Sequence, residues 1–163
     1  MKRLLVPLLC AGMASSAMAL DLVPWGTEGA WNILTDPDHD NACLTQVTYN
    51  DGSLLRIGFR EKGKKGFVTT VNPAWTSFKQ DHRYPVAYAV DDSAVVEVEA
   101  KGVKVGEMQG IEVFFEDPAV LLALVQGKDL KMAFDGAEIA SLSLEGSAKA
   151  LEAASACQVE NGG

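Results

Sequence analysis

Residues 117–157 read DPAVLLALVQGKDLKMAFDGAEIASLSLEGSAKALEAASAC, and this stretch decides the fold. Asp117 followed by Pro118 predicts a helix start, because a carboxylate caps the first turn and proline needs no N–H there. Alternating apolar residues then predict a strand, and Asp135-Gly136 predicts a tight turn into a second strand. A second helix is expected over residues 144–156, with Ser143 or Ser147 as its N-terminal cap. One face of this helix is expected to carry Leu144, Ala148, Leu151 and Ser155.

Upstream, short alternating runs predict strands at 30–34, 43–49, 53–60, 67–71, 86–90, 94–100, 103–108 and 111–116. Residues 20–29 read as an extended lead-in, and residues 72–85 read as a long loop with one helical turn. Many short strands at hairpin spacing, followed by two helices, predict a mainly β fold with its helices in the C-terminal half. We expect an antiparallel β-sandwich or an open barrel.

The first nineteen residues, MKRLLVPLLCAGMASSAMA, have the features of a secretory signal peptide. Lys2 and Arg3 precede an apolar core that is too short to span a bilayer, and Ala17-Met18-Ala19 is an A-x-A cleavage site. Cys10 follows Leu9 rather than a small residue, which argues against a lipid anchor. We therefore expect a single β-rich domain over 20–163, periplasmic or secreted, with no membrane insertion after cleavage.

The charge of the chain is acidic and unevenly distributed. Without Lys2 and Arg3 the formal net charge changes from −8 to −10. This argues against general binding to nucleic acid or anionic membranes, which requires a basic surface. Residues 20–88 are nearly neutral, whereas residues 89–163 carry five basic and fourteen acidic side chains.

Two cysteines, Cys43 and Cys157, remain after signal cleavage. Cysteine pairs in exported proteins usually form disulfides because the compartment is oxidising, so we predict a Cys43–Cys157 bridge, with two free thiols as the alternative. Closing a loop of this length stabilises the protein by about 4–5 kcal/mol in the chain-entropy model. A bridge would also remove both thiols from catalysis.

Motifs for catalysis are sparse. No G-x-S-x-G, P-loop or G-x-G-x-x-G is present, and no histidine has zinc-ligand spacing. Asp36, Asp38 and Asp40 have the spacing that opens an EF-hand, but Gly and Glu are missing at its sixth and twelfth positions, so an acidic turn and a cation site both remain open. His39 is read as a surface residue, and we predict no enzyme, no cofactor and no metal site. A hydrolase remains an alternative if a pocket joins His82 to Ser77 or Asp81.

Two segments are candidates for binding a protein partner. A basic hairpin carries Arg60, Lys62, Lys64 and Lys65, which suit an acidic partner or a solvated turn. An irregular loop carries Trp75, Phe78, Arg83 and Tyr84, and aromatics with cations are typical of contact surfaces, although a small core under a loop would use the same aromatics.

The C-terminal residues resemble those of a known family. A leucine-rich helix, Gly127-Lys128, a strand, the Phe134-Asp135-Gly136 hairpin and Ser141-Leu142-Ser143-Leu144-Glu145-Gly146 are similar to the ending of the invasion-associated locus B family of small exported Gram-negative proteins. The resemblance covers about 40 residues well, and it implies a periplasmic or surface β-rich domain linked to host-cell invasion. It implies no catalytic residues.

The sequence therefore favours an exported, non-enzymatic binding or accessory protein of the Gram-negative envelope, and the resemblance implies an association with invasion. The alternative is an acidic inhibitor or immunity-type protein that blocks a cationic enzyme through its acidic C-terminal half.

Overall fold

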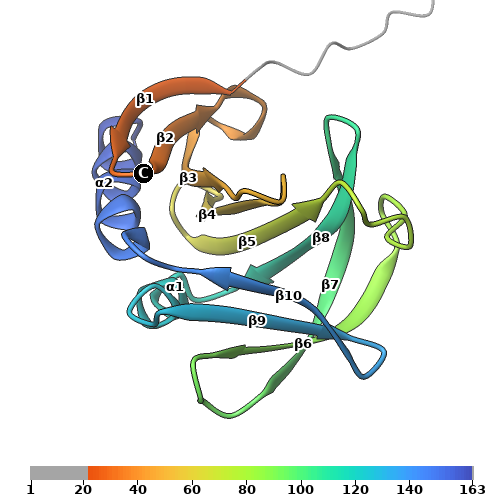
Figure 1. Ribbon diagram of the computed structural model, residues 1–163. Helices are drawn as coiled ribbons and strands as arrows, with labels where there is room; N and C mark the ends of the chain where they lie inside the picture. The colour runs from red at the N-terminus through yellow and green to blue at the C-terminus, as the bar shows by residue number, and fades with distance from the viewer. Residues whose placement is uncertain (1–21, 163) are drawn as a thin grey trace, which may run out of the picture.

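The structure, a computed structural model, describes residues 22–162, so the predicted signal peptide lies outside the described residues (Figure 1). One ten-stranded antiparallel sheet has the order β1-β2-β3-β4-β5-β8-β7-β6-β9-β10. The strands are β1 (Val23–Glu28), β2 (Trp31–Asp36), β3 (Ala42–Thr48), β4 (Leu54–Arg60), β5 (Lys65–Asn72), β6 (Arg83–Val90), β7 (Val96–Val105), β8 (Met108–Phe115), β9 (Asp129–Phe134) and β10 (Ala137–Ser143). The helices are a short 3-10 turn, η1 (Pro37–His39), then α1 (Ala119–Leu124) and α2 (Ser147–Glu160). The predicted mainly β fold with two late helices is confirmed.

The sheet curls around the core without closing. Thr70 Oγ1 on β5 donates to Met132 Sδ on β9 at 3.4 Å, although three strands separate β5 from β9 in the sheet. Strands β1 and β10 form the two edges and do not pair with each other. The result is an open, barrel-like sheet with α2 beside its first strands (Figure 1).

Strand alternation sends apolar side chains into the curl and polar side chains out of it. On β4, for example, Leu55, Ile57 and Phe59 are buried in the core, whereas Arg56 and Arg60 lie on the opposite face. Burying a leucine or isoleucine side chain contributes about 1.5–3 kcal/mol. This alternation therefore stabilises the sheet and leaves its outer face free to carry charged groups.

A disulfide between Cys43 on β3 and Cys157 on α2 attaches the last helix to the sheet, with a Cα–Cα distance of 6.0 Å. Both cysteines are fully buried. Gln158 accepts a hydrogen bond from the Cys43 N–H at 3.0 Å, which adds a second link at the same place. The predicted pairing of the two cysteines is therefore present in the structure.

The second helix begins later than predicted, at Ser147. Gly146 precedes it with φ +79°, a conformation that glycine adopts readily, so neither Ser143 nor Ser147 caps the helix through its side chain. The buried face is consequently rotated from the predicted stripe, and it consists of Ser147, Ala150, Leu151, Ala154, Cys157 and Gln158.

Two strand predictions also need correction. Residues 23–28 form β1 rather than a lead-in, and Pro24 is tolerated because β1 is an edge strand. The separate strands predicted at 94–100 and 103–108 are one strand, β7, which continues through Gly102. A side chain at Gly102 would overlap the Lys79 carbonyl, so this glycine allows the 73–82 loop to approach rather than breaking the strand. The turn falls at Gly106 instead, where φ is +57°.

Candidate functional site

The outer face of the sheet carries a row of polar residues that crosses seven strands. Strand alternation places every second residue on this face. The register between neighbouring strands places each member of the row opposite the next. Across β2, β3, β4, β5, β8, β7 and β6 the row is Asn32, Gln46, Arg56, Thr69, Glu112, Lys101 and Arg83.

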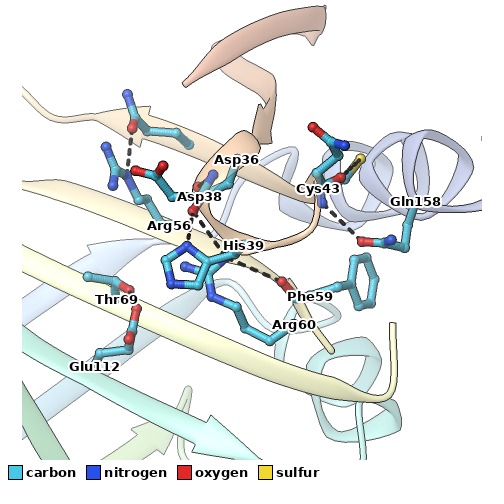
Figure 2. Close-up of polar contacts among 12 residues, drawn as sticks. Asp36, Asp38, His39, Cys43, Arg56, Phe59, Arg60, Thr69, Glu112 and Gln158 are labelled. Carbon is cyan, nitrogen blue, oxygen red and sulfur yellow. Dashed lines mark hydrogen bonds and ion pairs between the residues drawn. The ribbon is translucent and has the colours of Figure 1, made fainter. Parts of the chain in front are cut away.

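Neighbouring side chains of this row bind one another (Figure 2). Arg56 Nε donates to Gln46 Oε1 at 2.8 Å, and Thr69 Oγ1 donates to Glu112 Oε2. Burial lowers the pKa of the Arg56 guanidinium, and the nearby Asp36 carboxylate acts in the opposite direction. These contacts hold the middle of the row in a defined geometry before any partner binds.

Asp36 organises the edge of the site next to η1. Its buried carboxylate accepts hydrogen bonds from the Asp38 N–H at 3.2 Å, lies 2.9 Å from His39 Nδ1 and pairs with Arg60 Nη1 at 3.4 Å (Figure 2). Burial lowers the pKa of the Arg60 guanidinium, and the negative charges of Glu112 and Asp36 offset only part of that decrease. Thus Asp36 caps η1 and fixes Arg60 through the same side chain.

A small apolar row lies under Arg60 on the outer face. Leu44, Gly58, Phe67 and Phe114 are paired across β3, β4, β5 and β8. A Cβ at Gly58 would lie 2.5 Å from Leu44 Cβ, so only glycine leaves room for the neighbouring leucine. The Arg60 guanidinium covers the Phe67 ring, and Phe67 is fully buried.

Beside this apolar row a cleft of about 670 Å³ opens between η1, β4–β5 and the strands β6–β8. Six acidic and four basic side chains line it, together with His39 and Phe114. The acidic groups are Asp38, Asp40, Glu61, Glu99, Glu112 and Glu116, and the basic groups are Arg60, Lys65, Arg83 and Lys101. We call this surface the outer-face cleft.

The cations of the outer-face cleft are mostly paired. Lys65 Nζ lies 3.1 Å from Glu61 and 3.3 Å from Glu116, and Arg83 pairs with Glu99. These pairs are exposed, so each contributes little to stability and exchanges partners at low cost. They are therefore suited to re-pairing with charges on a bound molecule.

Three of the residues predicted to bind a partner meet in this cleft: Arg60, Lys65 and Arg83. Lys62 and Lys64 are exposed in the β4–β5 turn and lie outside it. Residues on β7 and β8 that complete the cleft, Lys101 and Glu112, were not predicted. Glu112 lies on an alternating strand, where a charged residue usually faces solvent, and only the register of β5, β8 and β7 places it beside the basic residues.

The aromatic loop is largely a small core. Phe78 is 2% exposed, and its ring centre lies 5.1 Å from those of Trp75 and Tyr84 and 5.2 Å from that of Phe134. The Phe78 ring therefore belongs to this small core rather than to the surface of the loop, and its predicted contact with a partner stays a prediction. Trp75 and Tyr84 are partly buried against it. Tyr84 Oη also accepts from the Lys79 N–H at 2.8 Å and donates to the Ser77 carbonyl at 3.1 Å, which fixes the loop.

The groups considered for catalysis or metal binding are engaged elsewhere. His82 Nδ1 lies 3.1 Å from the Gln80 carbonyl, and Asp81 pairs with Lys101 at 2.7 Å. Within residues 22–162 neither side chain forms a hydrogen bond with Ser77. Within residues 22–162, no three His, Cys, Asp or Glu side chains are grouped in a way that would hold a metal ion.

No helix in the described part of the chain has the length and apolar character that crossing a membrane requires. Comparison of the chain with family models, with curated proteins and with solved structures finds no match.

Proposed function

We propose that this chain is an exported, non-enzymatic protein-binding module of the Gram-negative cell envelope, and that the outer-face cleft is its contact surface. The observation that carries the proposal is the convergence of Arg60 and Lys65, from the β4–β5 hairpin, with Arg83, from β6, on one charged cleft. The buried disulfide and the sequence of residues 1–19 support an oxidising compartment outside the cytoplasm. The resemblance of residues 117–157 to the invasion-associated locus B family supports the same location and an invasion-associated role.

The construction of the cleft suits recognition of a protein surface. Its floor is fixed by the Arg60–Asp36 pair and the Thr69–Glu112 hydrogen bond, whereas its rim carries exposed ion pairs such as Arg83–Glu99. A fixed floor reduces the entropy lost on binding, and rim charges select the partner and accelerate encounter.

An experiment on charge reversal tests this proposal. The disulfide-bonded protein is immobilised and used to capture partners from a cross-linked envelope extract, in parallel with the double variant Arg83→Glu/Lys101→Glu. Lys149→Glu, which introduces the same kind of change on the exposed side of α2, is the control. We expect a partner recovered by wild type and by the control to be lost with the double variant. Equal recovery by all three proteins would place the contact surface elsewhere.

A second candidate function is inhibition of a cationic enzyme. The observation that favours it is the net acidity of the outer-face cleft, with six carboxylates against four cations. An inhibitor of this kind binds its target more weakly as salt rises, because exposed charges beyond a Debye length are screened. Binding that is insensitive to salt would contradict the inhibitor function and leave the binding-module function in place.

The non-enzymatic nature of the protein has its own test. Turnover of any substrate that is abolished by His39→Ala or His82→Ala, with the fold retained, would overturn it.

A further inference from the structure

The two edges of the sheet differ in how they resist the addition of another strand. On β1, Pro24 removes a backbone donor and the register shifts between Pro24 and Gly26. Prolines and bulges of this kind protect natural sheet edges from pairing. On β10 the register also shifts, between Glu138 and Ala140, but residues 140–143 (Ala-Ser-Leu-Ser) beyond that shift pair regularly with β9 and contain neither proline nor charge. The β10 edge is therefore the one open to a further strand.

The hydrogen-bond pattern shows which groups of β10 point away from β9. The Leu144 N–H donates to the Lys128 carbonyl at 2.7 Å, just beyond the end of the ladder. Because antiparallel pairs alternate, Leu142 and Ala140 also bond toward β9, whereas Ser141 and Ser143 bond away from it. Among the described residues only β9 runs alongside β10, so the Ser141 N–H and C=O are without a partner strand.

One group on this edge already has a partner. The Ser143 carbonyl accepts a hydrogen bond of 2.6 Å from the Tyr49 hydroxyl, which joins β10 to the β3–β4 turn. Beside that contact lies a pocket of about 500 Å³, lined in part by Trp31, Val47, Tyr49 and Ser143. An added strand would thus find backbone partners at Ser141 and a place for an apolar side chain next to Tyr49.

The charge around the edge indicates the chemistry of its occupant. From Asp135 to Gly146, the turn before β10 and β10 itself, the chain carries three acidic side chains and no basic one. Glu138 and Glu145 lie at the two ends of the regular segment, and both are exposed. Carboxylates at both ends of an edge favour a strand that carries lysine or arginine.

We propose that β10 receives an extended segment of a partner protein, in which lysine or arginine alternates with apolar residues, as an eleventh strand of the sheet. Backbone hydrogen bonds to Ser141 supply affinity, and the acidic surroundings supply selectivity. The β10 edge is separate from the outer-face cleft, and neither proposal depends on the other.

The probe for this proposal is a short capped peptide in which valine alternates with lysine, added to the disulfide-bonded protein. We expect it to bind and to slow amide hydrogen exchange at Ser141 and Ser143. Ser141→Pro removes only the N–H that points away from β9, so it leaves the β9–β10 ladder intact. It should weaken binding by roughly fivefold or more, because the peptide carbonyl loses its donor. Ser141→Ala, which keeps the backbone N–H, should bind as wild type does.

Three results would overturn the proposal. The first is equal binding of the peptide to Ser141→Pro and Ser141→Ala. The second is equal binding of a peptide with glutamate in place of lysine. The third is a dimer of the protein alone in sedimentation that Ser141→Pro dissociates, because the occupant would then be a second copy of the chain. If Ser141→Pro does not fold, a peptide N-methylated on alternate residues takes its place and must fail to bind wild type.

Discussion

The guanidinium carbon of Arg60 lies 4.0 Å from the centre of the Phe67 ring. Phe67 is a fully buried side chain on the outer face of the sheet, away from the main core. Arg60 therefore works as a cover for an apolar row as well as a charged group of the outer-face cleft. Its pairing with Asp36 holds it in that position. The site and the stability of this face are consequently coupled through one side chain.

Arg60→Ala should lower the free energy of unfolding by about 2–4 kcal/mol, because it uncovers Phe67 and leaves the buried Asp36 carboxylate without its cation. Urea denaturation monitored by tryptophan fluorescence measures the change. Arg83→Ala is the matched control, since Arg83 is exposed and its pair with Glu99 should contribute no more than about 1 kcal/mol. Equal losses for the two variants would show that Arg60 does not cover an apolar patch.

The disulfide should dominate the stability of the end of the chain. Replacing Cys43 and Cys157 together by alanine should cost about 4–5 kcal/mol in the chain-entropy model, because the bridge closes a loop with a sequence separation of 114. Denaturation of the two proteins without reductant measures the difference. Mass spectrometry of the unreduced protein under denaturing conditions checks the bridge itself, and two alkylatable thiols would contradict it.

Gly58→Ala should destabilise the protein by about 1–3 kcal/mol or more, because the new methyl group overlaps Leu44 and the Cys43 carbonyl. Gly26→Ala is the control, since a Cβ at Gly26 meets nothing within 4 Å. Thermal denaturation of both variants provides the comparison. A Gly58→Ala protein as stable as Gly26→Ala would mean that β3 and β4 are further apart than described.

Tyr49 should make the protein sensitive to alkali. Burial, and then the charge of Asp51, raise the pKa of Tyr49 above the ordinary tyrosine value of about 10. Because the pKa is raised in the folded state, the hydroxyl of the unfolded protein ionises at a lower pH than that of the folded protein. The contribution of Tyr49 to the free energy of unfolding is therefore complete below pH ~10 and is lost as the pH rises further.

Denaturation between neutral pH and the alkaline range tests this effect. Tyr49→Phe cannot ionise and cannot donate to the Ser143 carbonyl. It should be less stable than wild type at neutral pH, by about 0.5–1.5 kcal/mol for the lost hydrogen bond. It should also lose less stability than wild type at alkaline pH. Parallel pH profiles for the two proteins would show that Tyr49 is not responsible.

Predictions from the sequence succeeded where structure depends on neighbouring residues. The Asp135-Gly136 turn has φ of +51° and +77°. It was expected, because both residues tolerate positive φ locally. The start of α2 was predicted too early because Gly146, the third residue of the expected helix, adopts positive φ. The helix therefore begins only at the next residue, Ser147.

The candidate site was only partly predictable. Arg60 and Lys65 were noticed because they belong to one basic hairpin, and Arg83 because it was assigned to an aromatic loop. Glu112 and Lys101 gave no local signal, since a charged residue on an alternating strand is usually a solvated one. The same ambiguity concealed the burial of Phe78, whose surroundings come from β6 and β9 as well as from its own loop.

The sequence alone determined the β-rich class, the hairpin turns, the two late helices and the pairing of the two cysteines. The turns follow from local backbone sterics, and the strands and helices follow from side-chain periodicity. The cysteine pair follows because only two cysteines remain after the predicted signal cleavage. Only the tertiary structure decided that β5 lies beside β8 and β6 beside β9, and hence that Arg60, Lys65 and Arg83 share one cleft while β10 is left as an open edge. Strand order depends on how much apolar surface the whole sheet buries, which is set by contacts between segments far apart in the sequence. The residues of a single segment therefore do not reveal it.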